Sequence, residues 1–140
     1  MQSKYKDNLL FLRLFSGEDL FDKLREVCNL YKVKTAVVVS GLGQLQPFTL
    51  GYFEGKDEYN KKEFQEPHEL VALTGIISRY KEEIDIHLHA ALGGKDKETK
   101  SGHLFHAKVA ATNELVLLTS DVLIKRKHEE QTGLRGMFLE

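Results

Sequence analysis

The stretch Glu83-Ile-Asp-Ile-His-Leu-His-Ala90 alternates apolar and polar residues over its whole length. Because successive side chains of a β-strand point to opposite faces, this pattern predicts a strand with its isoleucines and leucine on one face. Asp85, His87 and His89 would then share the other face. Residues 103–110 follow after a connection rich in glycine, lysine and aspartate, so we expect the two segments to form an antiparallel hairpin with a long loop.

Segments on both sides of this hairpin also have strand character. Residues 17–31 are the exception, because their apolar side chains recur at helical spacing and Ser16 offers an N-cap, which predicts one amphipathic helix. Since most β-segments follow one another without an intervening helix, we predict an α+β fold with a mostly antiparallel sheet of about seven strands and one main helix. Strands are expected at residues 9–15, 35–40, 48–53, 70–78 and 114–125, with a turn at Gly41-Leu-Gly43 and a loop or exposed edge strand at 55–67.

The chain has 140 residues, of which 41% are hydrophobic and 29% are charged, a composition typical of a globular protein. We expect residues 1–140 to form a single domain. The net charge of −1 excludes a global positive field that would draw the chain to nucleic acid. No apolar run is long enough to span a bilayer, and the N-terminus has no apolar segment of the signal-peptide type. With Cys28 as the lone cysteine, these features predict a cytoplasmic protein without an internal disulfide or a membrane partner.

His87 and His89 are spaced for joint binding of a metal ion. Residues i and i+2 of a strand lie about 6.6–6.8 Å apart at Cα, a separation from which both imidazoles reach one ion. The predicted hairpin adds His103 if it lies opposite His89 or Ala91, because directly opposed residues point to the same face. His106 has the opposite parity and would point away unless a bulge intervenes.

Three histidines with no evident fourth protein ligand match the open coordination of a catalytic or ligand-binding zinc site. Imidazole also binds copper, iron and nickel, so the expected cofactor is zinc or another divalent transition metal. Two other interpretations stay open at this point. The histidines would be polar residues on a half-exposed sheet face, or they would line a subunit interface without a metal.

Five short motifs follow one another in a characteristic order. They are Arg13-Leu-Phe-Ser-Gly-Glu-Asp-Leu20, Gly41-Leu-Gly-Gln-Leu45, Leu73-Thr-Gly-Ile76, His87-Leu-His-Ala90 and Gly102-His-Leu104. In this order they resemble the plants-and-prokaryotes conserved (PPC) domain, known from plant AT-hook nuclear proteins and from free-standing prokaryotic proteins. The resemblance covers nearly the whole chain and implies an α+β fold with an antiparallel sheet, and a homotrimer. Free-standing members are often labelled DNA-binding proteins, and some resemble metal proteins through the positions of His87, His89 and His103.

The chain departs from this family in two places. Plant members carry basic AT-hooks outside the domain, and this sequence has none, since Arg135-Gly136 is not such a motif. Ser101 precedes Gly102-His103, where many relatives have a second glycine. The DNA-binding role therefore transfers weakly, although a trimer would concentrate a basic run such as Lys125 to Lys127.

The three sheet histidines also resemble those of acetolactate decarboxylase, whose zinc lies on a related fold. This likeness is at the level of the fold and carries no activity with it. It keeps an enzyme as the alternative, a zinc-dependent lyase or hydrolase that acts on a small oxygenated metabolite. Glu69 as an acid or base and Arg13 as an anion clamp are the catalytic candidates. Their non-catalytic interpretations are a surface carboxylate and a structural ion pair.

Our first hypothesis is therefore a homotrimeric PPC-domain protein that binds a divalent metal and serves as a binding or assembly module with a DNA-associated role. Composition supports the trimer, because apolar segments such as 36–39 and 115–118 need burial and one helix covers only one face of a sheet. In the alternative, residues 55–67 and the C-terminal tail fold over the second face and leave a monomer.

Overall fold

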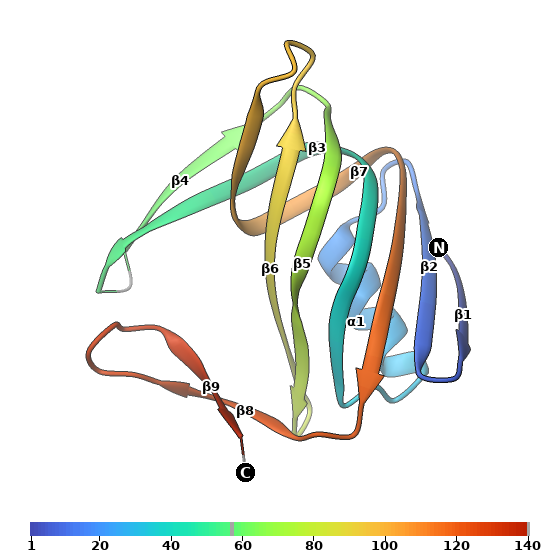
Figure 1. Ribbon diagram of the computed structural model, residues 1–140, viewed down its shortest axis with the longest axis vertical. Coiled ribbons are helices and arrows are strands. Elements are labelled where there is room, and N and C mark those ends of the chain that lie inside the picture. Colours follow the sequence, from blue (N-terminus) through green and yellow to red (C-terminus); the bar gives the residue numbers. More distant parts are fainter. Residues whose placement is uncertain (57, 140) are drawn as a thin grey trace.

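The computed structural model describes residues 1–56 and 58–139 (Figure 1). Within these residues, β1 to β7 form one antiparallel sheet in the order β1-β2-β7-β6-β5-β3-β4, and β8 and β9 form a separate two-stranded hairpin. The predicted α+β fold, with a mostly antiparallel sheet of seven strands and one main helix, is thereby confirmed. The elements are β1 (Gln2–Lys6), β2 (Leu9–Phe15), α1 (Leu20–Leu30), β3 (Thr35–Gly55), β4 (Glu58–Phe64), β5 (His68–Tyr80), β6 (Glu83–Gly93), β7 (Thr99–Ser120), β8 (Ile124–His128) and β9 (Arg135–Leu139).

Two long strands, β3 and β7, pair with each other and with several neighbours, which closes a circuit of four strands, β3, β5, β6 and β7. The sequence pattern predicts each of them as two shorter strands, and this prediction is wrong. The turn expected at Gly41-Leu-Gly43 is not formed, because Gly43 continues β3 and lies opposite Asn113 of β7. A Cβ at Gly43 would collide with the carbonyl oxygen of Thr112. The glycine therefore serves a close approach of two backbones within a continuous strand.

The helix expected over residues 17–31 exists, but its N-terminus is corrected. α1 begins at Leu20, because Asp19 and not Ser16 is its N-cap. The Asp19 carboxylate accepts hydrogen bonds from two amides of the first turn, at 2.9 and 3.0 Å. Gly17 lies before the cap with a φ of 85°, a left-handed conformation that suits a turn and not a helix. No helix in the described part of the chain is long and apolar enough to cross a membrane.

The polar ends of the chain form strands that the sequence pattern does not predict. β1 pairs with the edge of β2, and β9 pairs with β8, although neither has a regular alternation of apolar and polar residues. For residues 55–67 the sequence pattern allows a loop or an exposed edge strand, and the structure shows the edge strand β4 over Glu58–Phe64, while residue 57 lies outside the described part of the chain. Pairing with a neighbouring strand, more than local propensity, determines these segments.

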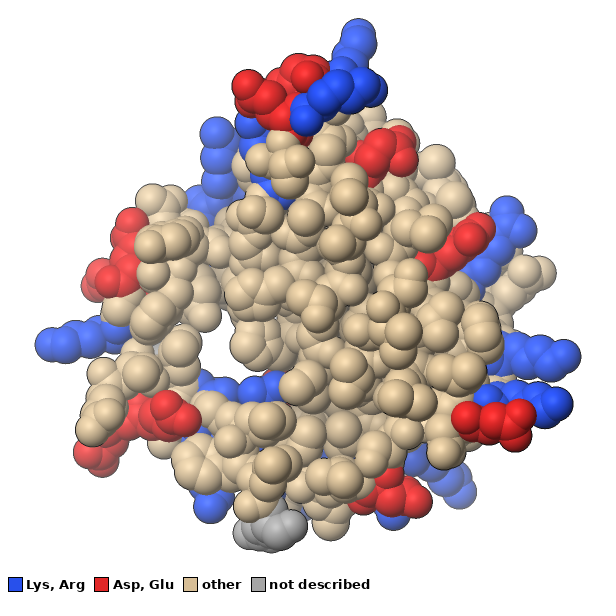
Figure 2. Space-filling model, viewed as in Figure 1, with Lys and Arg blue, Asp and Glu red and all other residues tan. Residues whose placement is uncertain are grey.

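The two faces of the sheet are covered differently. α1 packs on one face, against the fully buried or nearly buried Leu10, Leu12 and Leu14 of β2. The other face is turned to the viewer in Figure 1, and Figure 2 shows it as a broad uncharged area with charged side chains around its rim. The exposed apolar side chains on this uncovered face are Phe11 (51% exposed), Val37 (44%), Leu42 (50%) and Leu118 (46%).

A substitution at Gly75 of β5 would test how tightly β5 and β6 are packed. It lies opposite Leu88, and a Cβ at Gly75 would collide with the carbonyl oxygen of His87. Gly75→Ala should therefore lower the free energy of unfolding by about 1–3 kcal/mol, measured by urea denaturation. Gly93→Ala is the matched control, because a Cβ there meets only Val71 at 3.5 Å, an ordinary contact. Equal losses in the two variants would contradict the packing that we describe.

Candidate metal centre

The hairpin of β6 and β7 gathers three histidines on the uncovered face of the sheet. His89 lies directly opposite His103, which is one of the two registers considered from the sequence, and His87 lies two residues earlier on the same face of β6. Nε2 of His87 is 3.2 Å from Nε2 of His89, and one ring nitrogen from each of the three residues lies within 4.8 Å of the others. Strand alternation and cross-strand pairing thus bring the three imidazoles together. The most distant pair in the sequence, His87 and His103, is 16 residues apart.

Aromatic side chains from two strands pack against His103. The ring of Phe105 is 4.4 Å from the His103 ring between centroids, and Tyr59 of β4 is 5.3 Å away. The ammonium group of Lys61 lies 4.0 Å from the centre of the Phe105 ring. The edge strand β4 therefore forms one wall of the site and adds a positive charge to it.

The surroundings hold two of the imidazoles in their neutral form. Burial lowers the pKa of His87, and the positive charge of Arg126 and the neighbouring His89 lower it further, against an opposing effect of Asp85. Burial lowers the pKa of His103 to about 4, with further contributions from His87, His89 and Lys61. A neutral imidazole is the form that binds a metal ion, so these rings are ready to act as ligands at neutral pH.

The donor set fits a divalent transition metal with an open coordination position. Nδ1 of His103 is buried and has no hydrogen-bond partner within residues 1–56 and 58–139. Such an atom is costly in a folded protein unless a bound group or water satisfies the ring. No thiolate competes for the ion, because Cys28 is buried on α1, where burial raises its pKa to about 11.

A cavity of about 480 Å³ opens beside the histidines, and the β8–β9 hairpin forms part of its wall. Figure 2 shows a hollow on this side of the molecule, with lysine or arginine atoms at its edge. His87 and His103 line the cavity together with Arg126, whose side chain is only 7% exposed. In the sequence Arg126 belongs to a basic run, and its position beside the histidines is not predicted. No sequence signal gives it, because β8 reaches the site only through the tertiary packing of the hairpin.

Among the described residues, the catalytic candidates Glu69 and Arg13 lie outside the histidine cluster. His106, which is expected to point away from the cluster, has its Nε2 3.3 Å from the Asp19 carboxylate, near the start of α1. Glu69 accepts a hydrogen bond from Nε2 of Gln44 at 2.8 Å. Arg13 lies on β2, and its guanidinium stacks 5.3 Å from the centre of the Phe15 ring.

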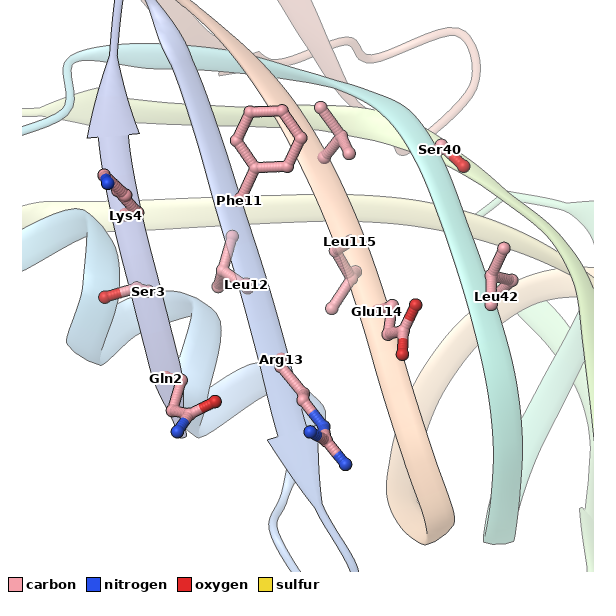
Figure 3. Close-up of a pocket in the computed structure, with 11 residues that line it drawn as sticks. Gln2, Ser3, Lys4, Phe11, Leu12, Arg13, Ser40, Leu42, Glu114 and Leu115 are labelled. Atoms are coloured by element: carbon pink, nitrogen blue, oxygen red, sulfur yellow. The ribbon is translucent and has the colours of Figure 1, made fainter.

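Arg13 borders a separate hollow of about 470 Å³ on the uncovered face (Figure 3). Figure 3 shows Arg13 and Glu114 projecting from the neighbouring strands β2 and β7, with Phe11 and Leu42 on the same hollow. Neither Glu69 nor Arg13 is among the described residues that line the cavities next to the histidines. Their catalytic roles stay predictions.

The fold and the cluster define a class of protein, an α+β domain with an antiparallel sheet that carries a three-histidine candidate metal centre. The profile of one family, the Plants and Prokaryotes Conserved (PCC) domain, matches residues 1–121. The chain belongs to this family, which is the PPC family that its motifs indicate. No curated protein sequence gives a match.

Solved structures with the same fold cover almost the whole chain. A metal-containing protein from Archaeoglobus fulgidus is 33% identical with a TM-score of 0.84, and the match covers 99% of each chain. A protein described as a putative DNA-binding protein from Bacteroides thetaiotaomicron is 26% identical with a TM-score of 0.91, over 99% of this chain and 96% of that one. A PPC protein from Pyrococcus horikoshii is 24% identical with a TM-score of 0.80, over the same shares, and this likeness shows the fold.

The pKa of His103 predicts a pH dependence for the metal-free protein. Its imidazole should titrate near pH 4, well below the ordinary 6.5, in a series of NMR spectra of the ring. The unfolded chain then binds a proton on this residue at pH values where the folded chain does not. The free energy of unfolding should therefore rise with pH between about 4 and 6.5, and His103→Asn should reduce this slope. A His103 titration near 6.5 would contradict burial as the cause.

Proposed function

We propose that this protein binds one divalent metal ion per chain, zinc, through His87, His89 and His103, and acts as a binding or assembly module. The observation that carries this proposal is the convergence of three ring nitrogens within 4.8 Å. The relative from Archaeoglobus fulgidus, described as a metal-containing protein, supports it. Three neutral imidazoles leave a coordination position for an outside ligand, as in open zinc sites.

A second candidate function is a zinc-dependent lyase or hydrolase that acts on a small oxygenated metabolite. The cavity next to His87 and His103 favours it, because a volume of about 480 Å³ suits a small molecule. A bound zinc ion would polarise a carbonyl group or activate water. The chain's own residues would hold the molecule in the cavity and limit its contact with solvent.

The proposal includes a homotrimer. Support comes from the uncovered face, where Phe11, Leu42 and Leu118 are about half exposed, since contiguous apolar surface of this kind is typical of a subunit interface. β4, which was considered as a cover for this face, instead extends the sheet at its edge. Symmetric burial between copies would remove the apolar surface from water.

The proposal also includes a DNA-associated role. It is supported by the description of the relative from Bacteroides thetaiotaomicron. The net charge of −1 favours only weak, salt-sensitive association with a duplex. On the face shown in Figure 2, lysines and arginines are scattered along the rim among acidic residues. We also infer a cytoplasmic location, because the lone thiol of Cys28 suits a reducing compartment.

The metal site is tested by elemental analysis of untagged protein. The wild type should carry about one zinc ion per chain, and His103→Ala should lose most of it because an open site needs three protein ligands. His106→Ala is the matched control, since this histidine lies on the same strand but pairs with Asp19. Equal loss of metal from both variants, or full metal content after His87→Ala, would refute the assignment.

The trimer is tested by sedimentation at micromolar concentration. A trimer of this 16.0 kDa chain has a mass of about 48 kDa (three times 16.0), and Leu42→Lys should shift the species towards the monomer by placing a charge on the uncovered face. Leu30→Lys is the control, because Leu30 is equally apolar and 64% exposed but lies on α1. A wild-type species of 16 kDa would exclude the trimer.

A further inference from the structure

The C-terminal hairpin adds a group of charged side chains to the cavity beside the histidines. β8 and β9 begin after residue 121, where the match to the family ends. Arg126 of β8 and Arg135 of β9 each lie 3.4 Å from the carboxylate of Asp85. Asp85 is on β6, two residues before His87 and on the same face, so this group of charges borders the candidate metal centre.

Arg126 is buried more deeply than an ordinary surface ion pair. Its side chain is 7% exposed, and its Nε and Nη2 atoms are buried without a hydrogen-bond partner in the part of the chain that the structure describes. The Asp85 oxygen at 3.4 Å is too far from Nε for a good hydrogen bond. A buried guanidinium with unsatisfied donors is costly, and an anion that accepts from it lowers this cost.

The charged side chains that line the cavity carry no net charge of their own, because Arg126 and Arg135 are matched by two acids, Asp85 and Glu129. Outside this lining, the ammonium group of Lys61 adds a positive charge over the Phe105 ring, which packs against His103. Three neutral imidazoles bring no negative charge, so a divalent ion at their centre leaves the site with a net positive charge. An anionic ligand would neutralise it.

We propose that this cavity binds a small carboxylic acid, with its carboxylate on the guanidinium of Arg126 and its other polar end directed to the metal at the histidine cluster. The planar guanidinium matches the planar carboxylate and offers paired donors to it. Apolar residues that line the same cavity, Leu134 and Met137, would contact the carbon skeleton. Asp85 forms an ion pair with both Arg126 and Arg135. This proposal rests on the metal site proposed above and names its class of ligand.

The test is calorimetric titration of the zinc-loaded protein with lactate, after the zinc content of every sample is measured. Lactate should bind, and lactamide, which has the same shape without the charge, should bind at least tenfold more weakly. Arg126→Lys should weaken lactate binding by about tenfold or more, because lysine lacks the paired donors. Arg13→Lys is the matched control and should leave lactate binding unchanged, since Arg13 lines a different hollow.

The outcomes separate the two proposals. Absence of zinc from the wild type would refute the metal site, whereas bound zinc with equal affinity for lactate and lactamide would refute the carboxylate ligand alone. The carboxylate proposal would also be overturned if Arg126→Lys left lactate binding unchanged or if Arg13→Lys lost lactate binding. Tighter binding of inorganic phosphate than of lactate would overturn it as well.

A measurement on the wild type keeps the test independent of any folding defect in the variants. Magnetisation transfer from the lactate methyl group to the Met137 methyl group should be seen by NMR, because Met137 lines the cavity. Transfer only to protons of the uncovered face, such as those of Phe11, would place the ligand elsewhere and refute the proposal.

Discussion

The direct opposition of His89 and His103 across β6 and β7 is the constraint on which the site depends. The side-chain period of a strand is two, so a slip of one residue would turn a histidine to the face that packs on the core. Backbone hydrogen bonds in the connecting turn hold this register. The Gly94 amide donates to the Glu98 carbonyl at 2.9 Å, and the Lys97 amide donates to the Gly94 carbonyl at 3.0 Å.

The two faces of β6 have different roles, since one packs in the core and the other carries His87 and His89. Leu88, Ala90 and Leu92 are buried in the main core, and they hold the strand in place regardless of what the other face carries. His87 and His89 are therefore held by a strand that is fixed in the core, and their positions do not depend on the ordering of a loop. A site built on paired strands keeps its geometry more closely than one built on loops. Partial burial of the His87 ring on this strand lowers its pKa and so favours the neutral form that binds a metal.

The site was predictable from sequence to the extent that its geometry is local. Strand alternation and hairpin parity give the convergence of His87, His89 and His103, because both depend on residues close in sequence. The continuity of β3 through Gly43 was not predictable, since a glycine that ends a strand and one that admits a neighbouring backbone look alike in a single sequence. The position of Arg126 was not predictable either. Its run of basic residues is typical of a solvated strand end, and only the fold of the hairpin buries it.

The C-terminal hairpin is structurally separable from the sheet that it borders. Every described residue of the main core cluster lies at or before Leu117, and β8 and β9 pair only with each other among the described strands. Exchange or loss of this hairpin would leave the main core cluster intact but would change one wall of the cavity beside the histidines. A change in the hairpin would therefore alter the cavity wall without altering the strands that carry the three histidines.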